Sequence, residues 1–255
     1  MEKLLSGGIG IRGMEQYTRE EFESFMKSMK KVSDILHSKS PDYIFAPLIG
    51  SVPLIDILAI IDRHFPLENV EYPPNSSRFI NREQIIDKWF SNFIQAHYHG
   101  EKMSIIGIDE IISGSSAIKG YNEFSKILYF LSKEDPESSL EKKINYEILG
   151  IGEVPRRGKR NHTFSKLINK KKATVIETNR IITADNILLN PVRLKLGEVN
   201  SQGRQTYLPE VESFVYSPEY ISLLQNVASY FGANPDNIHP ANLSKIKDSS
   251  RRYLK

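Results

Sequence analysis

The sequence contains no cysteine, and this absence excludes several kinds of protein. Disulfide-stabilised folds, cysteine-ligated zinc, iron–sulfur clusters and thiol nucleophiles all need that residue. Long apolar runs are also missing. The longest, around Leu54 to Ile61, is interrupted by Asp56 and followed by Asp62, and it is far shorter than the roughly 20 residues that cross a bilayer. The first residues lack the apolar core of a signal peptide. We therefore expect a cytoplasmic protein that does not enter a membrane.

A large excess of charge is missing as well. The 255 residues carry a net charge of +3, with 40% hydrophobic and 25% charged residues. These values are ordinary for a globular protein with a proper core. So weak a charge neither requires nor excludes nucleic acid or anionic ligands. The length suits one large domain, or one domain with a sizeable appendage.

The segment from Met103 to Ala117, MSIIGIDEIISGSSA, carries the clearest functional pattern. An apolar run, typical of a strand buried on both faces of a parallel sheet, leads into Asp109. Small residues then begin a helical pattern. The first N–H groups of a helix have no partner within it and carry partial positive charge, and small residues let a phosphate approach the backbone closely. The pattern predicts an anion site at the end of the strand, with Asp109 placed to accept hydrogen bonds from ribose hydroxyls. A plain helix N-terminus is the alternative interpretation.

This segment resembles the phosphoribosyl-diphosphate (PRPP) signature of the type I phosphoribosyltransferases. That signature is four apolar residues, two acids, three mostly apolar residues and then Thr-Gly-x-Thr. An alignment without a gap places its second acid on Asp109 and its first acid on Ile108. A one-residue deletion would instead pair the two acids with Asp109 and Glu110; we prefer the ungapped alignment because it keeps the loop length. The remaining matched positions are the three spacers Glu110, Ile111 and Ile112, followed by Ser113, Gly114, Ser115 and Ser116.

A second segment strengthens the resemblance. A short apolar strand, Tyr43 to Pro47, precedes a tight turn and then an apolar helix from Leu54 to Ile61. The turn is similar to the family's loop that holds pyrophosphate with backbone amides, here Ile49, Gly50 and Ser51. The family often has an arginine or lysine where this chain has Ile49. A structural strand-turn-helix unit is the alternative, but the order of the two segments matches the family's layout over roughly residues 40 to 150.

The resemblance implies an α/β fold: a Rossmann-like open, mostly parallel sheet with helices on both faces and an α+β C-terminal extension or hood. We expect an N-terminal helical segment at 1–39 packing on the core, the α/β core at 40–190, and a C-terminal extension at 191–255 with one helix and a flexible tail. A capping box at Thr18 begins the first helix. Short strands are expected at 70–72, 146–151, 173–178 and 181–183, and irregular chain over 190–212.

Basic residues near the expected site offer further contacts. Arg78 lies in a loop expected at residues 73–78. The resembled family has a mobile lid in this region, and Arg78 could contact pyrophosphate from there. The segment 154–172 holds eight lysines and arginines and no acid, and Arg156, Arg157 and Lys159 cluster within it. Such a loop could reach a phosphorylated ligand or bind nucleic acid by counterion release. A solvated surface loop is the remaining interpretation of these residues.

The resemblance implies an enzyme that binds PRPP with Mg²⁺ and passes ribosyl phosphate to an unknown nitrogenous acceptor. Asp109 would be the catalytic residue and would hold the ribose with Glu110, while the amides from Ser113 to Ser116 would hold the 5′-phosphate. Magnesium would sit on ligand oxygens and have no direct protein ligand.

The alternative is a weakly active or inactive module on the same fold that senses PRPP or a nucleotide, together with a protein or nucleic-acid partner. A homodimer is a plausible assembly. An unrelated hydrolase or dehydrogenase is disfavoured, because no G-x-S-x-G occurs and no G-x-G-x-x-G follows a strand.

Overall fold

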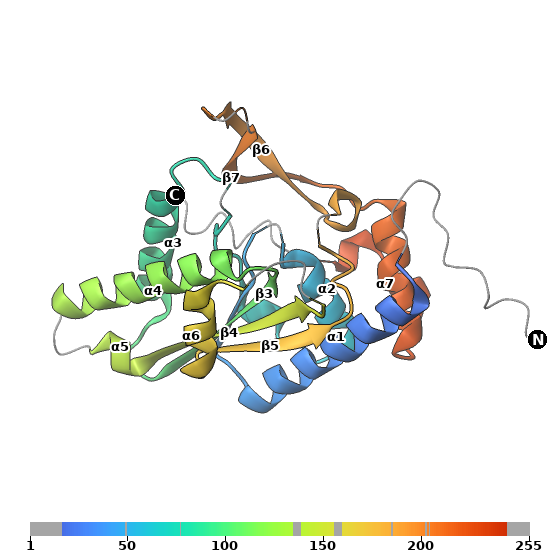
Figure 1. Ribbon diagram of the computed structural model, residues 1–255, viewed down its shortest axis with the longest axis horizontal. Coiled ribbons are helices and arrows are strands. Elements are labelled where there is room, and N and C mark those ends of the chain that lie inside the picture. The colour runs from blue at the N-terminus through green and yellow to red at the C-terminus, as the bar shows by residue number, and fades with distance from the viewer. Residues whose placement is uncertain are drawn as a thin grey trace, which may run out of the picture.

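A central sheet of five parallel strands organises the molecule (Figure 1). The computed structural model describes residues 17–48, 50–76, 78–134, 139–155, 160–184, 186–201, 203 and 205–243. The strand order is β2-β1-β3-β4-β5. The strands are β1 (Tyr43–Phe45), β2 (Val70–Glu71), β3 (Met103–Ile111), β4 (Ile144–Glu153) and β5 (Ala173–Thr178). The expected α/β fold with a parallel sheet is confirmed.

Helices cover both faces of this sheet. One hydrophobic cluster joins the sheet to α1 (Arg19–Lys39), α2 (Val52–Ile61) and α7 (Pro218–Tyr230). The helices that pack on the opposite face are α3 (Arg82–His97), α4 (Ser115–Glu134), α5 (Leu140–Lys143) and α6 (His162–Asn169). Side chains of β3 alternate between the two faces, so Ile106 and Ile108 join the first cluster and Ile105 joins the second. The short 3-10 helices are η1 (Leu67–Asn69), η2 (Ile187–Leu189), η3 (Pro235–Asn237) and η4 (Pro240–Asn242).

The first helix begins as its sequence predicts. The Thr18 hydroxyl accepts a hydrogen bond from Glu21 N at 3.1 Å, and the Glu21 carboxylate accepts one from Thr18 N at 2.6 Å. Two of the helix's unpartnered N-terminal donors are satisfied in this way. The apolar stripe of α1, from Phe22 to Leu36, is buried against the sheet and α2. This helix therefore packs on the core, while residues 1–16 of the expected N-terminal segment lie outside the described residues.

The strand order makes a topological switch point at the carboxyl ends of β1 and β3, and we call this place the crevice. From β1 the chain passes to β2 on one side, and it then returns past β1 to β3 on the other side. The helices that follow β1 and β3, α2 and α4, therefore lie on opposite faces. Their first turns diverge at the carboxyl ends of these two neighbouring strands, which is the place where open α/β sheets bind ligands.

Two of the predictions for the C-terminal third are wrong. Residues 190–212, expected to be irregular, lie largely in an antiparallel hairpin of β6 (Val192–Val199) and β7 (Gln205–Phe214). Register shifts at three places along this hairpin break the alternation by which a strand is recognised in a sequence. Residues 181–183, expected to be a strand, form a turn in which the side chain of Glu153 accepts a hydrogen bond from Ile181 N at 2.8 Å.

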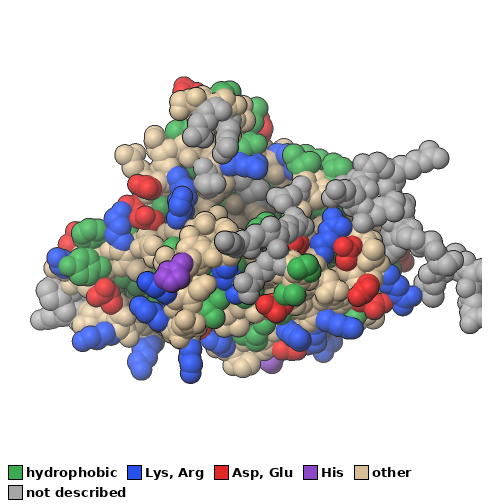
Figure 2. All heavy atoms as spheres, in the orientation of Figure 1, with side chains coloured by type: hydrophobic (Ala, Val, Ile, Leu, Met, Phe, Trp, Pro, Cys, Tyr) green, Lys and Arg blue, Asp and Glu red, His purple; other side chains and the backbone are tan. Residues whose placement is uncertain are grey.

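The hairpin projects from the body of the molecule and pairs with the connection between β2 and α3 (Figures 1 and 2). Tyr207 N donates to Arg78 O at 2.9 Å, and Ile80 N donates to Tyr207 O at 3.2 Å. The space-filling view shows the surface hollowed beneath the hairpin (Figure 2). None of the helices in the described ranges is long and apolar enough to cross a membrane.

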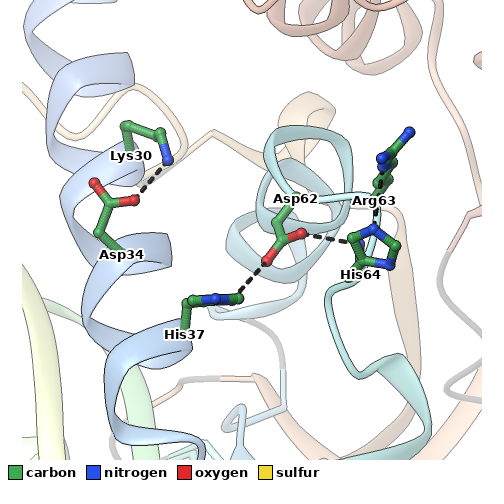
Figure 3. A network of polar contacts seen from close by, with 6 residues as sticks. All are labelled: Lys30, Asp34, His37, Asp62, Arg63 and His64. Atoms are coloured by element: carbon green, nitrogen blue, oxygen red, sulfur yellow. Dashed lines mark hydrogen bonds and ion pairs between the residues drawn. The ribbon is translucent and has the colours of Figure 1, made fainter.

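A polar network joins the far ends of α1 and α2 (Figure 3). Asp62, which follows α2, accepts a hydrogen bond from His64 N at 2.9 Å and lies 4.0 Å from the imidazole of His37. Arg63 Nε donates to His64 Nε2 at 3.1 Å. His37 is largely exposed, so these contacts add little to stability. They lie at the opposite end of α2 from the crevice.

Candidate functional site

The carboxylate of Asp109 meets the turn after β1 in the crevice. Asp109 is two residues before the end of β3, and Ser51 immediately precedes α2. The Ser51 hydroxyl donates to Asp109 Oδ1 at 3.3 Å, and the backbone N–H of Glu110 donates to the same oxygen at 2.9 Å. A Cβ added to Gly50 would lie 3.9 Å from that oxygen. The turn and the acid, 58 residues apart in the chain, therefore form one site.

Burial makes the ionised form of Asp109 costly. The pKa of this carboxyl rises from 3.8 to about 6, chiefly because the surrounding protein desolvates it. The hydrogen bonds from Glu110 N and Ser51 act in the opposite direction but do not outweigh burial. Nearby, burial and the charge of Asp109 raise the pKa of Tyr146, which remains a neutral phenol. Asp109 itself is only partly buried by surface area, yet its carboxyl is desolvated. An acid with a perturbed pKa at the ligand-binding end of a sheet is typical of a functional site.

The start of α4 offers open hydrogen-bond donors. Gly114 has φ +80°, and its carbonyl accepts the first helical bond, from Ile118 N at 3.0 Å. It thus occupies the capping position without a side chain to cap the helix. The Ser113 hydroxyl accepts from Ser115 N at 3.3 Å, but no partner for the N–H of Ser116 or Ala117 is found among the described residues. Two backbone donors are left for a ligand.

Phe164 of α6 explains why residue 114 is glycine. A Cβ at this position would lie 2.5 Å from the Phe164 ring, closer than real contacts allow. Ser113, the residue before Gly114, also links the turn to α6, because its carbonyl accepts a hydrogen bond from Asn161 N at 2.8 Å. The turn that begins α4 is therefore shaped by the helix after β4 as well as by its own sequence.

Only one of the two expected acids faces this crevice. Ile108, the position of the family's first acid in the ungapped alignment, is fully buried in the core beside α2. Glu110 follows Asp109 directly on a strand and so points to the opposite face. Its carboxylate accepts a hydrogen bond from the Thr183 hydroxyl at 2.6 Å. Neither alignment of the signature places a pair of carboxylates together at the site.

The remaining predicted residues lie around the crevice or outside the described ranges. Ser116 is exposed, and Ser113 and Ser115 are partly exposed, at the beginning of α4. Arg78 is exposed in the connection after β2. Its backbone carbonyl is held by the hairpin, as described above. The predicted residues outside the description are Ile49, Arg156, Arg157 and Lys159.

Several residues of the site were not predicted. Asn75 comes from a Pro-Pro-Asn-Ser-Ser run that reads as a solvated loop, yet it is buried and hydrogen-bonded to the first turn of α4. Thr183 reaches Glu110 from the turn after β5. Tyr146 could be recognised as an aromatic residue in β4, but its place beside Asp109 depends on the register of two strands. No local sequence signal marks these long-range contacts.

No cluster of three or more metal-ligating side chains occurs among the described residues. Comparisons with protein-family models, with curated proteins and with solved structures give no match to this chain. The geometry therefore defines a class and no narrower group: a doubly wound α/β protein with a carboxylate and open helix N–H groups at its switch point. Such a site can accept hydrogen bonds from a diol and donate them to an anion.

Proposed function

We propose that the crevice between β1 and β3 binds PRPP with Mg²⁺, and that the protein transfers ribosyl phosphate to a nitrogenous acceptor in the manner of a type I phosphoribosyltransferase. The observation that carries the proposal is the contact between Ser51 and Asp109. It joins the two segments that resemble the family's pyrophosphate and ribose-phosphate loops, at the ligand-binding edge of the sheet.

Each part of the crevice has a chemical role in this proposal. The ionised Asp109 accepts hydrogen bonds from the ribose hydroxyls and stabilises positive charge that develops on the sugar. The N–H groups of Ser116 and Ala117 donate to the 5′-phosphate. The Gly50–Ser51 turn faces the pyrophosphate, and Mg²⁺ is held by ligand oxygens, as this ion prefers.

The reaction needs little covalent chemistry from the protein. The bond from C1′ to the pyrophosphate oxygen breaks with its electron pair on pyrophosphate, and the acceptor nitrogen forms the new bond to C1′ and loses a proton. The protein contributes mainly by orienting the two reactants and stabilising the leaving group. The hydrogen bonds to Asp109 Oδ1 help to hold that carboxylate in place.

A second function on the same site is favoured by one observation. Of the three positions that the two alignments match to the family's acids, only Asp109 faces the crevice. Ile108 is buried in the core, and Glu110 points to the other face and is bonded to Thr183. A site with one carboxylate retains the contacts that recognise a sugar phosphate but has less charge to stabilise a cationic transition state. The alternative proposal is a module that senses PRPP or a nucleotide and does not consume it.

Release of pyrophosphate distinguishes the two proposals. The full chain is incubated with PRPP, Mg²⁺ and a panel of nitrogenous bases, and pyrophosphate is measured over time. The enzyme proposal predicts release that depends on one class of base and falls at least about tenfold in Asp109→Asn, the loss expected for one charged hydrogen bond. Binding of PRPP without release for any base would favour the sensor. Absence of binding would contradict both.

A further inference from the structure

Asn75 is a buried polar side chain at the junction of three structural elements. It is 5% exposed although it lies in the connection between β2 and α3. Its amide nitrogen donates to Ser116 O at 3.0 Å, and its amide oxygen accepts a hydrogen bond from Arg82 of α3. Both ends of the amide are thus used, which fixes its orientation. The contact with Ser116 lies in the turn of α4 whose N–H groups are open.

Gly120 permits this close approach. A Cβ at position 120 would lie 2.5 Å from Asn75 Nδ2. Glycine within a helix is unfavourable relative to alanine, so the sequence retains a residue that weakens α4 but lets the connection dock on it. The same connection also reaches the turn after β1, because Pro73 O accepts hydrogen bonds from Leu48 N and Asn75 N. Residues 73–75 therefore contact both sides of the crevice.

Ser76, the next residue, links Asn75 to the second part of the connection, residues 78–80. Its hydroxyl accepts from Arg78 N at 3.2 Å, and its carbonyl accepts from Phe79 N at 3.2 Å. These two bonds join residues 75–76 to residues 78–79 directly. The side chain of Phe79 is buried, which anchors the second part of the connection in the core.

The hairpin is bonded to that second part. Tyr207 of β7 exchanges two backbone hydrogen bonds with Arg78 and Ile80. The Ile80 side chain packs against Gly197 of β6, and a Cβ at position 197 would lie 2.6 Å from the terminal methyl of Ile80. An isolated two-stranded hairpin is only marginally stable in water, so the attachment at Tyr207 matters for its order.

We infer that Asn75 is a positioning residue that couples the first turn of α4 to the β6–β7 hairpin. Through this coupling, a sugar phosphate bound at the turn makes the hairpin more ordered. The inference rests on the proposed function for its ligand. The path runs from Ser116 through the Asn75 amide to Ser76, and from there through residues 78–80 to Tyr207. A ligand bound at the turn makes these hydrogen-bonded residues more ordered. Loss of the Asn75 amide removes the connection between the turn of α4 and the hairpin.

Hydrogen exchange of the whole chain tests the coupling, first without ligand. In Asn75→Ala we expect the amides of Ile80 and Tyr207 to exchange about five- to tenfold faster, as loss of one buried hydrogen bond would give. Asn75→Asp, which keeps the size and an acceptor for Arg82 but loses the donor to Ser116, serves if the alanine variant does not fold. Asn122→Ala makes the same change at an exposed site of α4 and should leave this exchange unchanged.

The second stage adds PRPP with Mg²⁺. In the natural chain we expect slower exchange at residues 113–118, which reports binding, and also at residues 205–214, which reports coupling. In the Asn75 variants the first effect should persist and the second should disappear, an outcome that a merely structural role does not produce.

Two results would overturn the inference. One is hairpin exchange that the Asn75 variants do not alter without ligand. The other is equal protection of the hairpin by ligand in the natural chain and the variants. Lack of protection at residues 113–118 in the natural chain would instead contradict the proposed function, and the ligand-free comparison would still decide whether Asn75 couples the two elements.

Discussion

The hydroxyl of Ser51 lies 3.3 Å from Oδ1 of Asp109, and this contact joins the first and third strands of the sheet at their carboxyl ends. Ser51 belongs to the turn that begins α2, and Asp109 belongs to the strand that leads to α4. The two helices leave the sheet on opposite faces. The contact therefore marks the switch point of the fold and the centre of the proposed ligand site.

Replacing Asp109 by asparagine should stabilise the protein at neutral pH. Burial raises the pKa of Asp109 to about 6 from 3.8. The folded state binds the proton more tightly than the unfolded state, so the cost of the ionised carboxylate is fully present above pH 6 and disappears as the pH falls below about 4. We expect Asp109→Asn to gain about 1–3 kcal/mol at pH 7.5 and little at pH 4.

Urea unfolding at the two pH values measures this gain. Asp236→Asn, the same change at an exposed position, is the matched control and should alter stability by only a few tenths of a kcal/mol. A gain at pH 7.5 with loss of ligand binding would identify Asp109 as an acid kept for function at the expense of stability. An Asp109→Asn variant that is less stable than the natural chain at pH 7.5 would refute the burial argument.

Gly114→Ala should destabilise the turn through two effects. The residue has φ +80°, a conformation that costs a non-glycine residue about 1–2 kcal/mol. Its Cβ would also collide with the Phe164 ring. Gly232→Ala is a control with φ +74° and nothing within 4 Å of the added atom, so it carries the conformational cost alone. Thermal unfolding should rank Gly114→Ala as clearly the less stable; equal losses would mean that the ring moves aside without cost.

Gly120→Ala tests the docking of the β2–α3 connection on α4. Helix propensity alone predicts a gain of up to about 1 kcal/mol for this change. The added methyl group would lie 2.5 Å from Asn75 Nδ2, however, and we expect a net loss of about 1–2 kcal/mol from overpacking. Denaturant unfolding of Gly120→Ala beside Lys119→Ala, an exposed neighbour on the same helix, gives the comparison. A net gain for Gly120→Ala would show that the connection adjusts freely.

Tyr220→Phe should weaken the attachment of the C-terminal helix. The Tyr220 hydroxyl donates to Asp56 Oδ2 at 2.5 Å, and both side chains are buried. Removing one donor from a buried carboxylate costs about 1–3 kcal/mol. Tyr230→Phe removes a hydroxyl from a ring that is 41% exposed and should be nearly neutral. Guanidinium unfolding measures the stability of the two variants. Equal stability of Tyr220→Phe and Tyr230→Phe would contradict a structural role for the bond between Tyr220 and Asp56.

The fold was predictable wherever local patterns set it. The capping box at Thr18, the apolar stripe of α1 and the alternation of apolar strands with helices all lie within short windows of sequence. The end of α7 before Gly232, where φ is +74°, is also set locally, because glycine readily adopts this conformation after a helix. The hairpin was missed because its bulges remove the strict alternation of side chains.

The site was predictable only in part. Asp109 and the turn at Ser113 to Ser116 could be identified because a strand, an acid and small residues follow each other directly. The division of Asp109 and Glu110 between the two faces follows from strand geometry, but the partner that holds Glu110, Thr183, lies 73 residues away. Asn75 is similar: a run rich in proline and serine predicts a loop, and only the tertiary structure brings it under α4.

Titration calorimetry with PRPP and Mg²⁺ at pH 7.5 tests the central claim most directly. The account predicts saturable binding to the natural chain and to Asp236→Asn. For Asp109→Asn it predicts a loss of about 10- to 100-fold in affinity, the effect of one or two charged hydrogen bonds. The same affinity for Asp109→Asn as for the natural chain, or no binding by the natural chain, would contradict the claim that this carboxylate holds a sugar phosphate.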